Sequence, residues 1–150
     1  MAKAKASAPS AGYSGTPLLK KLGYNNDQSA ALIDAPKPLR APLIAAKFKT
    51  LTETVIEDAA GLKGPLDAVH VFTTERIKLK RVLPLLMKRL APAGMIWVSW
   101  PKKAAKVETD ITEDVVRAEA LPLGLVDVKV CAVDDIWSGL KLVIRKELRK

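Results

Sequence analysis

Two lysines and a serine lie at the end of an apolar run, and together their side chains could bind an anion. Residues 95–100 are apolar except for Ser99, and Trp100 closes the run. Lys102 and Lys103 follow almost at once. Their ammonium groups suit a phosphate or a carboxylate, because charge-assisted hydrogen bonds to anions are short and strong. A tryptophan beside them predicts a recognition surface for a small ligand or a protein partner.

The run over residues 95–100 has the pattern of a strand that is buried on both faces. Its odd-numbered and even-numbered positions are both apolar, apart from Ser99. In a parallel sheet such a strand is central, and ligands bind just beyond the carboxyl ends of the strands. The pattern therefore places the serine and the two lysines at a ligand-binding edge.

The predicted site takes further residues from two other segments. One is the N-terminal segment with its tyrosine and hydroxyl side chains, and the other holds a second tryptophan with a neighbouring serine. The candidate ligand- or partner-binding residues are Tyr13, Ser14, Thr16, Ser99, Trp100, Lys102, Lys103, Trp137 and Ser138.

The sequence offers no catalytic or metal-binding set. Catalysis by Ser99 would need a base, and the sequence around it contains no histidine. The single histidine, His70, falls within another apolar strand pattern, and the single cysteine, Cys131, is predicted to be a packing thiol. One histidine and one cysteine do not make a metal site. We therefore predict no catalytic residue and no metal, and the lone cysteine fits a reducing cytoplasm.

The composition predicts one globular domain. The chain has 150 residues, of which 49% are hydrophobic and 27% are charged, as in ordinary soluble domains. Residues 1–11 are basic and of low complexity, so we predict a disordered tail followed by a single α/β domain over residues 12–150. No apolar run approaches the roughly 18 residues that span a bilayer, so we expect no membrane partner and a cytoplasmic location.

A net charge of +9 permits binding to nucleic acid. Two clusters contribute much of this charge: Arg76, Lys78, Lys80, Arg81, Lys88 and Arg89 in one segment, and Lys141, Arg145, Lys146, Arg149 and Lys150 at the C-terminus. Aromatic side chains usually stack on the bases in such surfaces. Only Trp137 lies near either cluster, so nucleic-acid binding is an alternative and not the main interpretation.

Helical and strand patterns alternate along the chain. The expected helices are residues 17–22, 43–51, 75–90 and 111–121, the third interrupted by Pro84 and the last opened by a capping box of Asp110 and Glu113. The expected strands are residues 29–34, 52–57, 66–72, 95–100, 125–133 and 140–144. This order predicts an α/β, Rossmann-like fold with a mostly parallel sheet, a C-terminal antiparallel hairpin and helices on both faces.

Four segments resemble those of a known protein family. They are GYSGTPLLKKLG (residues 12–23), GMIWVSWPKK (94–103), TDITEDVVR (109–117) and LGLVDVKVCAVDDIWSGLKLVIR (123–145). In these segments the chain resembles a family of small, uncharacterised bacterial proteins that is catalogued as a domain of unknown function. The resemblance covers nearly all of residues 12–148. It implies a methyltransferase-like Rossmann fold and no named activity.

A methyltransferase that uses S-adenosylmethionine is the first alternative to a binding role. Glycines after the first strand would let the backbone approach that cofactor, yet the turn over residues 34–38 has no glycine and contains Pro36 and Pro38. Proline has no N–H to donate. An acid after the second strand, Glu57 or Asp58, could hold a ribose. We therefore expect no cofactor, and our main interpretation is a non-catalytic binding or interaction role.

Overall fold

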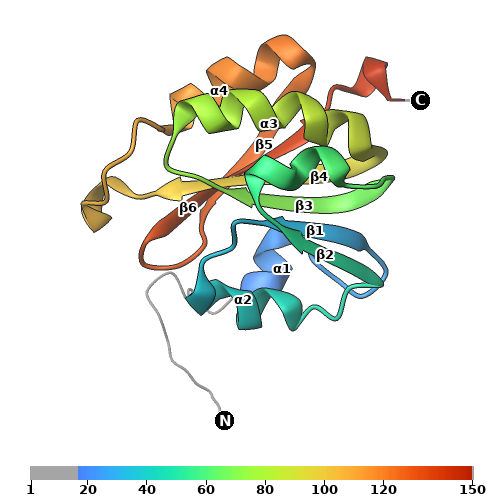
Figure 1. Ribbon diagram of the computed structural model, residues 1–150, viewed down its shortest axis with the longest axis horizontal. Coiled ribbons are helices and arrows are strands. Elements are labelled where there is room, and N and C mark those ends of the chain that lie inside the picture. Colours follow the sequence, from blue (N-terminus) through green and yellow to red (C-terminus); the bar gives the residue numbers. More distant parts are fainter. Residues whose placement is uncertain (1–16, 150) are drawn as a thin grey trace.

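The computed structural model describes residues 17–149 (Figure 1). The strands are β1 (Ser29–Ile33), β2 (Thr50–Thr54), β3 (Leu66–Phe72), β4 (Leu90–Pro101), β5 (Leu125–Ala132) and β6 (Trp137–Ile144). The α-helices are α1 (Leu18–Leu22), α2 (Lys37–Ile44), α3 (Arg76–Arg89) and α4 (Glu113–Ala120). Short 3₁₀ helices are η1 (Ile56–Gly61), η2 (Lys103–Ala105), η3 (Leu121–Leu123) and η4 (Lys146–Leu148). The predictions for residues 1–11, and for Tyr13, Ser14 and Thr16, lie outside the described residues.

The strands form one six-stranded sheet with the order β2-β1-β3-β4-β6-β5. Strands β2, β1, β3 and β4 are parallel, while β6 pairs antiparallel with both β4 and β5. Figure 1 shows α3 and α4 on one face of the sheet and α1 and α2 on the other. The predicted α/β Rossmann-like fold, with its antiparallel C-terminal hairpin, is confirmed.

The sheet separates two apolar clusters, and β4 contributes to both. Ile96, Val98 and Trp100 pack into the cluster beneath α3 and α4. Trp97 packs into the cluster on the side of α1 and α2. All four of these side chains are buried, because β-strand side chains alternate between the two faces and each face is covered. The prediction that this strand is central and doubly covered is confirmed.

Two predicted boundaries in the first half of the chain are wrong. Helix α2 begins at Lys37, after an N-cap at Pro36, and not near residue 43. Prolines are tolerated in the first turn of a helix, where an N–H would have no partner, so the two prolines of this turn start the helix. Strand β2 consequently begins at Thr50, two residues before the predicted start at residue 52, and ends at Thr54. Residues 56 and 57, predicted to end that strand, belong to η1.

Two features of the second half also differ from prediction. Thr112, and not Asp110, is the N-cap of α4, and its side chain accepts a hydrogen bond from the N–H of Val115. The register of β5 against β6 shifts between Asp127 and Lys129. Such a bulge breaks the alternation of side chains along the strand, and Val128 within it is 52% exposed.

Candidate functional site

A cavity of about 380 Å³ lies at the carboxyl end of β4, beside η2 and the start of α4. We call it the β4–α4 cavity. It is lined by Trp100, Pro101, Lys102, Lys103, Thr109, Ile111, Thr112, Glu113 and Ser138. Four of these residues were predicted from the sequence as part of one binding site. The carboxyl-end rule for ligand sites in α/β sheets accounts for their meeting here.

Backbone pairing holds the predicted residues of this cavity in place. Trp100 pairs with Ser138 across the antiparallel β4–β6 ladder. The N–H of Lys102 donates to the carbonyl of Ile136 at 2.7 Å, which ties the chain just after β4 to the turn before β6. Trp100 is only 6% exposed and belongs to the apolar cluster under α3 and α4. It therefore forms part of the wall of the cavity and is not a free surface tryptophan.

The charges around this cavity do not cancel. The one carboxylate in its lining, Glu113, is paired with Arg117 on the next turn of α4. Arg117 also binds Asp127 at 2.9 Å, and hydrogen bonds from these partners raise the pKa of the Arg117 guanidinium. Within residues 17–149, neither Lys102 nor Lys103 forms an ion pair. The cavity therefore presents two uncompensated positive charges.

The structure places two other predicted site residues, Ser99 and Trp137, elsewhere. Ser99 is fully buried on the face of the sheet that carries α1 and α2. Trp137 packs edge-to-face against Phe72, with ring centroids 5.3 Å apart, in the apolar cluster of that same face. Neither residue lines the β4–α4 cavity.

Sequence reasoning missed a buried polar network under α1. The Tyr24 hydroxyl lies 3.0 Å from Nδ1 of His70, and Nε2 of His70 lies 2.8 Å from Oγ of Ser99. Burial lowers the pKa of His70 to about 3, so the ring is neutral and can donate at one nitrogen and accept at the other. The ring also stacks on Phe72, with centroids 4.2 Å apart. A serine and a histidine therefore do meet, but all three polar groups are buried.

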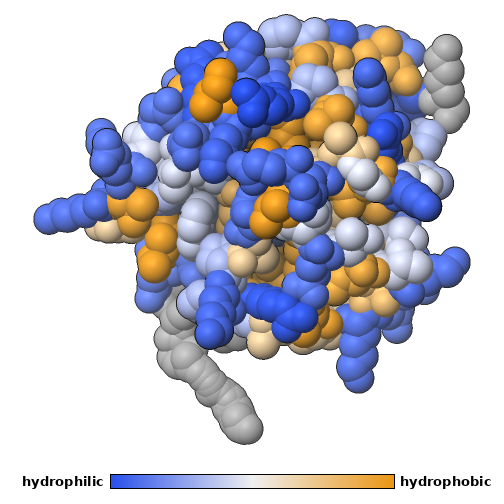
Figure 2. Space-filling view, viewed as in Figure 1, coloured by the Kyte–Doolittle hydropathy of each residue, from blue (hydrophilic) through white to orange (hydrophobic). Residues whose placement is uncertain are grey.

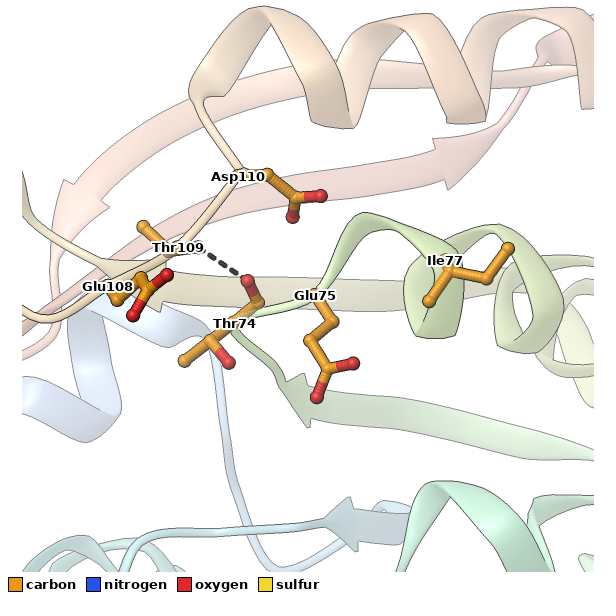
Figure 3. A pocket seen from close by; sticks show the side chains of 6 residues that line it. All are labelled: Thr74, Glu75, Ile77, Glu108, Thr109 and Asp110. Carbon is orange, nitrogen blue, oxygen red and sulfur yellow. Dashed lines mark hydrogen bonds between the residues drawn. The ribbon is translucent and has the colours of Figure 1, made fainter.

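A second cavity, of about 440 Å³, lies between the end of β3 and the segment before α4 (Figure 3). We call it the acidic cavity, and it is lined by Thr74, Glu75, Ile77, Glu108, Thr109 and Asp110. The Thr109 hydroxyl donates to the Thr74 carbonyl at 2.7 Å, the bond dashed in Figure 3. Asp110 accepts a hydrogen bond from the N–H of Arg76 at 2.7 Å and so joins the start of α3 to this segment. Over residues 17–149 no group of His, Cys, Asp or Glu could hold a metal ion.

A third cavity, of about 380 Å³, lies at the carboxyl ends of β1 and β2. Its lining is Leu32, Asp34, Ala35, Glu53, Thr54 and Val55. Strand β1 stands between β2 and β3 in the sheet, so the direction of winding reverses between β1 and β3. In open α/β sheets that reversal is where a nucleotide-type cofactor binds. The β1–β2 cavity shares strand β1 with that crevice, so it is the place to test for S-adenosylmethionine.

The residues of the β1–β2 cavity do not fit a cofactor cradled by a glycine turn. Asp34 stands at the left-handed position, φ 56°, and its carboxylate accepts a hydrogen bond from the N–H of Ile56 at 3.0 Å. The prolines at 36 and 38 leave the start of α2 with fewer N–H donors. Glu53, and not Glu57 or Asp58, is the acid at the end of β2. The guanidinium of Arg40 donates hydrogen bonds to both carboxylate oxygens of Glu53, from Nε to Oε1 at 2.6 Å and from Nη2 to Oε2 at 2.8 Å.

The Asp34 carboxylate has a structural role that a substitution can test. Asp34→Ala removes the carboxylate that accepts the hydrogen bond from the N–H of Ile56. It also places alanine, which has no polar side chain to bond locally, in a left-handed backbone conformation. Together the two effects should lower the free energy of unfolding by about 2 kcal/mol. Asp34→Asn is the matched control, because its amide oxygen still accepts and asparagine tolerates that conformation. Urea denaturation measures both variants. Equal losses in the two would contradict the role.

Half of the basic cluster on α3 is engaged within the protein. Arg76 pairs with Glu119 at 2.6 Å, Lys78 lies 3.5 Å from two acids, and Nε of Arg89 donates to the Leu62 carbonyl. These side chains are less available to phosphates than the sequence indicated. Nucleic-acid binding stays a prediction that rests on the remaining cations. No helix among residues 17–149 has the length and apolar character needed to cross a membrane.

Comparison with known proteins identifies the fold. No protein-family model matches the chain, and no curated protein matches it in sequence, so the resemblance to a bacterial family stays a prediction. Among solved structures, the glycopeptide N-methyltransferase MtfA in complex with S-adenosylmethionine is similar, with a TM-score of 0.62, 10% identity and coverage of 85% of both chains. The CcbJ methyltransferase from Streptomyces caelestis gives a TM-score of 0.61 at 7% identity, covering 85% of this chain and 88% of that one.

A third similar structure is the ribosomal protein L11 methylase from Lactobacillus delbrueckii subsp. bulgaricus. Its TM-score is 0.59 at 13% identity, with coverage of 79% of this chain and 71% of that one. At such low identities the likeness extends to the fold alone. The chain therefore has a methyltransferase-like Rossmann fold.

Proposed function

We propose that this chain is a binding protein on a methyltransferase-like fold, with its ligand in the β4–α4 cavity. One observation carries the proposal: Trp100, Lys102, Lys103 and Ser138, from two strands and a loop, line a single cavity at the carboxyl edge of the sheet. A concave site that combines apolar walls with a few polar groups is the usual form of a small-ligand site.

A non-catalytic role is supported by the position of the groups that could do chemistry. The sequence has one histidine, and His70 is buried with Ser99 away from the cavity. The single carboxylate of the cavity lining is held by Arg117. A carboxylate paired with a guanidinium is a weaker base, and a base out of reach of the ligand takes no part in proton transfer.

The second candidate function is that of a methyltransferase that uses S-adenosylmethionine. The fold and the position of the β1–β2 cavity favour it, and Glu53 stands where an acid could accept the ribose hydroxyls. The proline-containing turn and the engaged Asp34 oppose it. Even so, the Arg40–Glu53 pair is exposed to solvent, and such pairs contribute only about 0 to 1 kcal/mol, so that pair alone would not keep a cofactor out.

A thermal-shift experiment separates the two functions. We expect S-adenosylmethionine and S-adenosylhomocysteine to leave the Tm of the full chain unchanged. A ligand at about 100 times its Kd adds roughly 2.7 kcal/mol to the free energy of unfolding, which for a protein of this size raises Tm by roughly 5–10 °C. A rise of that size, absent in Glu53→Gln, would show a cofactor site in the β1–β2 cavity and favour the second candidate over the first. Adenosine, tested alongside, serves as the control for binding of the nucleoside part alone.

A further inference from the structure

We infer that the ligand of the β4–α4 cavity is a small amphipathic anion, with an apolar body and one carboxylate or phosphate head. This inference rests on the proposed function and adds the chemical class of the ligand. The lining of the cavity divides into an apolar wall, a rim of hydroxyl groups and two lysines. Each of the three parts restricts what can bind.

The apolar wall selects the body of the ligand. Trp100, Pro101 and Ile111 are all buried residues of the lining, and their side chains are largely apolar. Burying the body of a ligand against them gains roughly 25 cal/mol for each Å² of apolar surface removed from water. A fully hydrated ion such as inorganic phosphate has no such surface to bury. The cavity therefore favours an anion with an attached apolar group.

Two exposed apolar residues belong to segments that adjoin the lining in the sequence. Ile136, whose carbonyl accepts from Lys102, is 43% exposed, and Val107, in the loop that follows η2, is equally exposed. They lie two positions from the lining residues Ser138 and Thr109. In Figure 1 the η2 turn projects at the left end of the molecule, and Figure 2 shows hydrophobic surface at that end between hydrophilic side chains.

The two lysines select the head of the ligand. Lys102 and Lys103 have no ion pair within the described part of the chain, and Glu113 opposite them is already neutralised by Arg117. A cationic ligand would be repelled by the two ammonium groups, and the one carboxylate of the lining is already paired with Arg117. An anionic head can take hydrogen bonds from the ammonium groups, and the hydroxyl of Ser138 is a further donor in the same lining.

Ligand titrations followed by NMR test both parts of this class. The probes are benzoate and phenyl phosphate, with benzamide as the neutral analogue of benzoate and acetate as the anion without a ring. We expect benzoate and phenyl phosphate to perturb the backbone amides of Lys102, Thr112 and Ser138. Benzamide should bind about tenfold more weakly, since a hydrogen bond to a charged partner is worth about that factor at a partly exposed site. Acetate should also bind about tenfold more weakly, because it lacks the ring whose burial gains roughly 25 cal/mol for each Å² of apolar surface.

Variants of matched charge provide the control. Lys102→Ala combined with Lys103→Ala should make benzoate bind no better than benzamide. Lys80→Ala combined with Lys88→Ala removes the same charge from exposed positions on α3, outside the β4–α4 cavity, and should leave the preference for benzoate intact. If the α3 variant also loses the preference, the lysines act only through net charge and the inference is wrong.

The outcomes distinguish the ligand class from the function itself. Equal affinities for benzoate and benzamide would overturn the anionic head, and equal affinities for benzoate and acetate would overturn the apolar body. In both cases the perturbed amides would still locate a binding site in the cavity, so the proposed function would stand. Perturbations confined to other surfaces, or no binding by any probe, would overturn the ligand class and the cavity together.

Discussion

Replacing Trp97 by alanine should lower the free energy of unfolding by about 3 to 5 kcal/mol, the usual cost of removing a large aromatic side chain from a core. Trp97 is fully buried and is the largest such side chain in the described residues. Its Nε1–H donates to the Leu22 carbonyl at 2.9 Å, and its ring lies against Gly139 on the neighbouring strand. Alanine would leave both a cavity and a carbonyl without its donor.

Urea denaturation followed by far-UV circular dichroism measures this change, because that signal does not depend on the tryptophan that is removed. Trp97→Phe is the matched control: it keeps most of the volume, loses the N–H, and should cost about 1 to 2 kcal/mol. An unchanged slope of the free energy of unfolding against urea concentration would show that all three proteins expose the same surface when they unfold. A loss below 1 kcal/mol for the alanine variant would contradict the packing described for this face of the sheet.

Acidification should destabilise the protein through His70. Burial lowers its pKa from 6.5 to about 3 in the folded protein. Below pH 6.5 the unfolded chain therefore binds a proton that the folded protein does not, and stability is lost as the pH falls from about 6.5 toward 3. At 1.36 kcal/mol per pKa unit, the loss between pH 7 and pH 4 should be about 3 kcal/mol from this one residue.

The variant His70→Gln isolates the contribution of the imidazole from that of the carboxylates. Glutamine keeps a donor and an acceptor near Tyr24 and Ser99 but does not titrate. We expect the variant to be less stable than the native protein at pH 7 and to lose about 3 kcal/mol less between pH 7 and pH 4. Free energies of unfolding from urea titrations at each pH provide the comparison. Parallel pH profiles for the two proteins would mean that His70 can reach solvent in the folded state.

The grouping of Trp100, Lys102 and Lys103 at one edge of the sheet could be predicted from the sequence because it depends on local patterns. A doubly apolar run that ends in Trp100 indicates a central parallel strand, and the two lysines follow its carboxyl end. Ser138 joins them because β6 pairs antiparallel with β4, whereas the sequence predicted only the antiparallel hairpin of the last two strands. None of these steps needs the position of an individual atom.

The contacts that the sequence could not reveal depend on register and on packing between distant segments. His70 and Ser99 meet because β3 and β4 pair with Phe72 opposite Ser99, which leaves the imidazole one diagonal step from the hydroxyl. Tyr24 reaches the same ring from the loop after α1. The ion pair between Glu113 and Arg117 is local to α4. It affects the charge of the cavity only because Lys102 and Lys103, from another segment, line the same cavity as Glu113.

The shift of register in β5 also affects how the sheet ends. Strands β2 and β5 are its two edges, and an unpaired edge can recruit a strand from another molecule unless it is interrupted or charged. In β5 the interruption falls between Asp127 and Lys129, so a bulge and two charges occupy the middle of the strand. In β2 the exposed Glu53, paired with Arg40, places charge on the edge strand. Both edges are therefore poor templates for edge-to-edge aggregation, although Val128 in the bulge and Val130 beyond it are exposed.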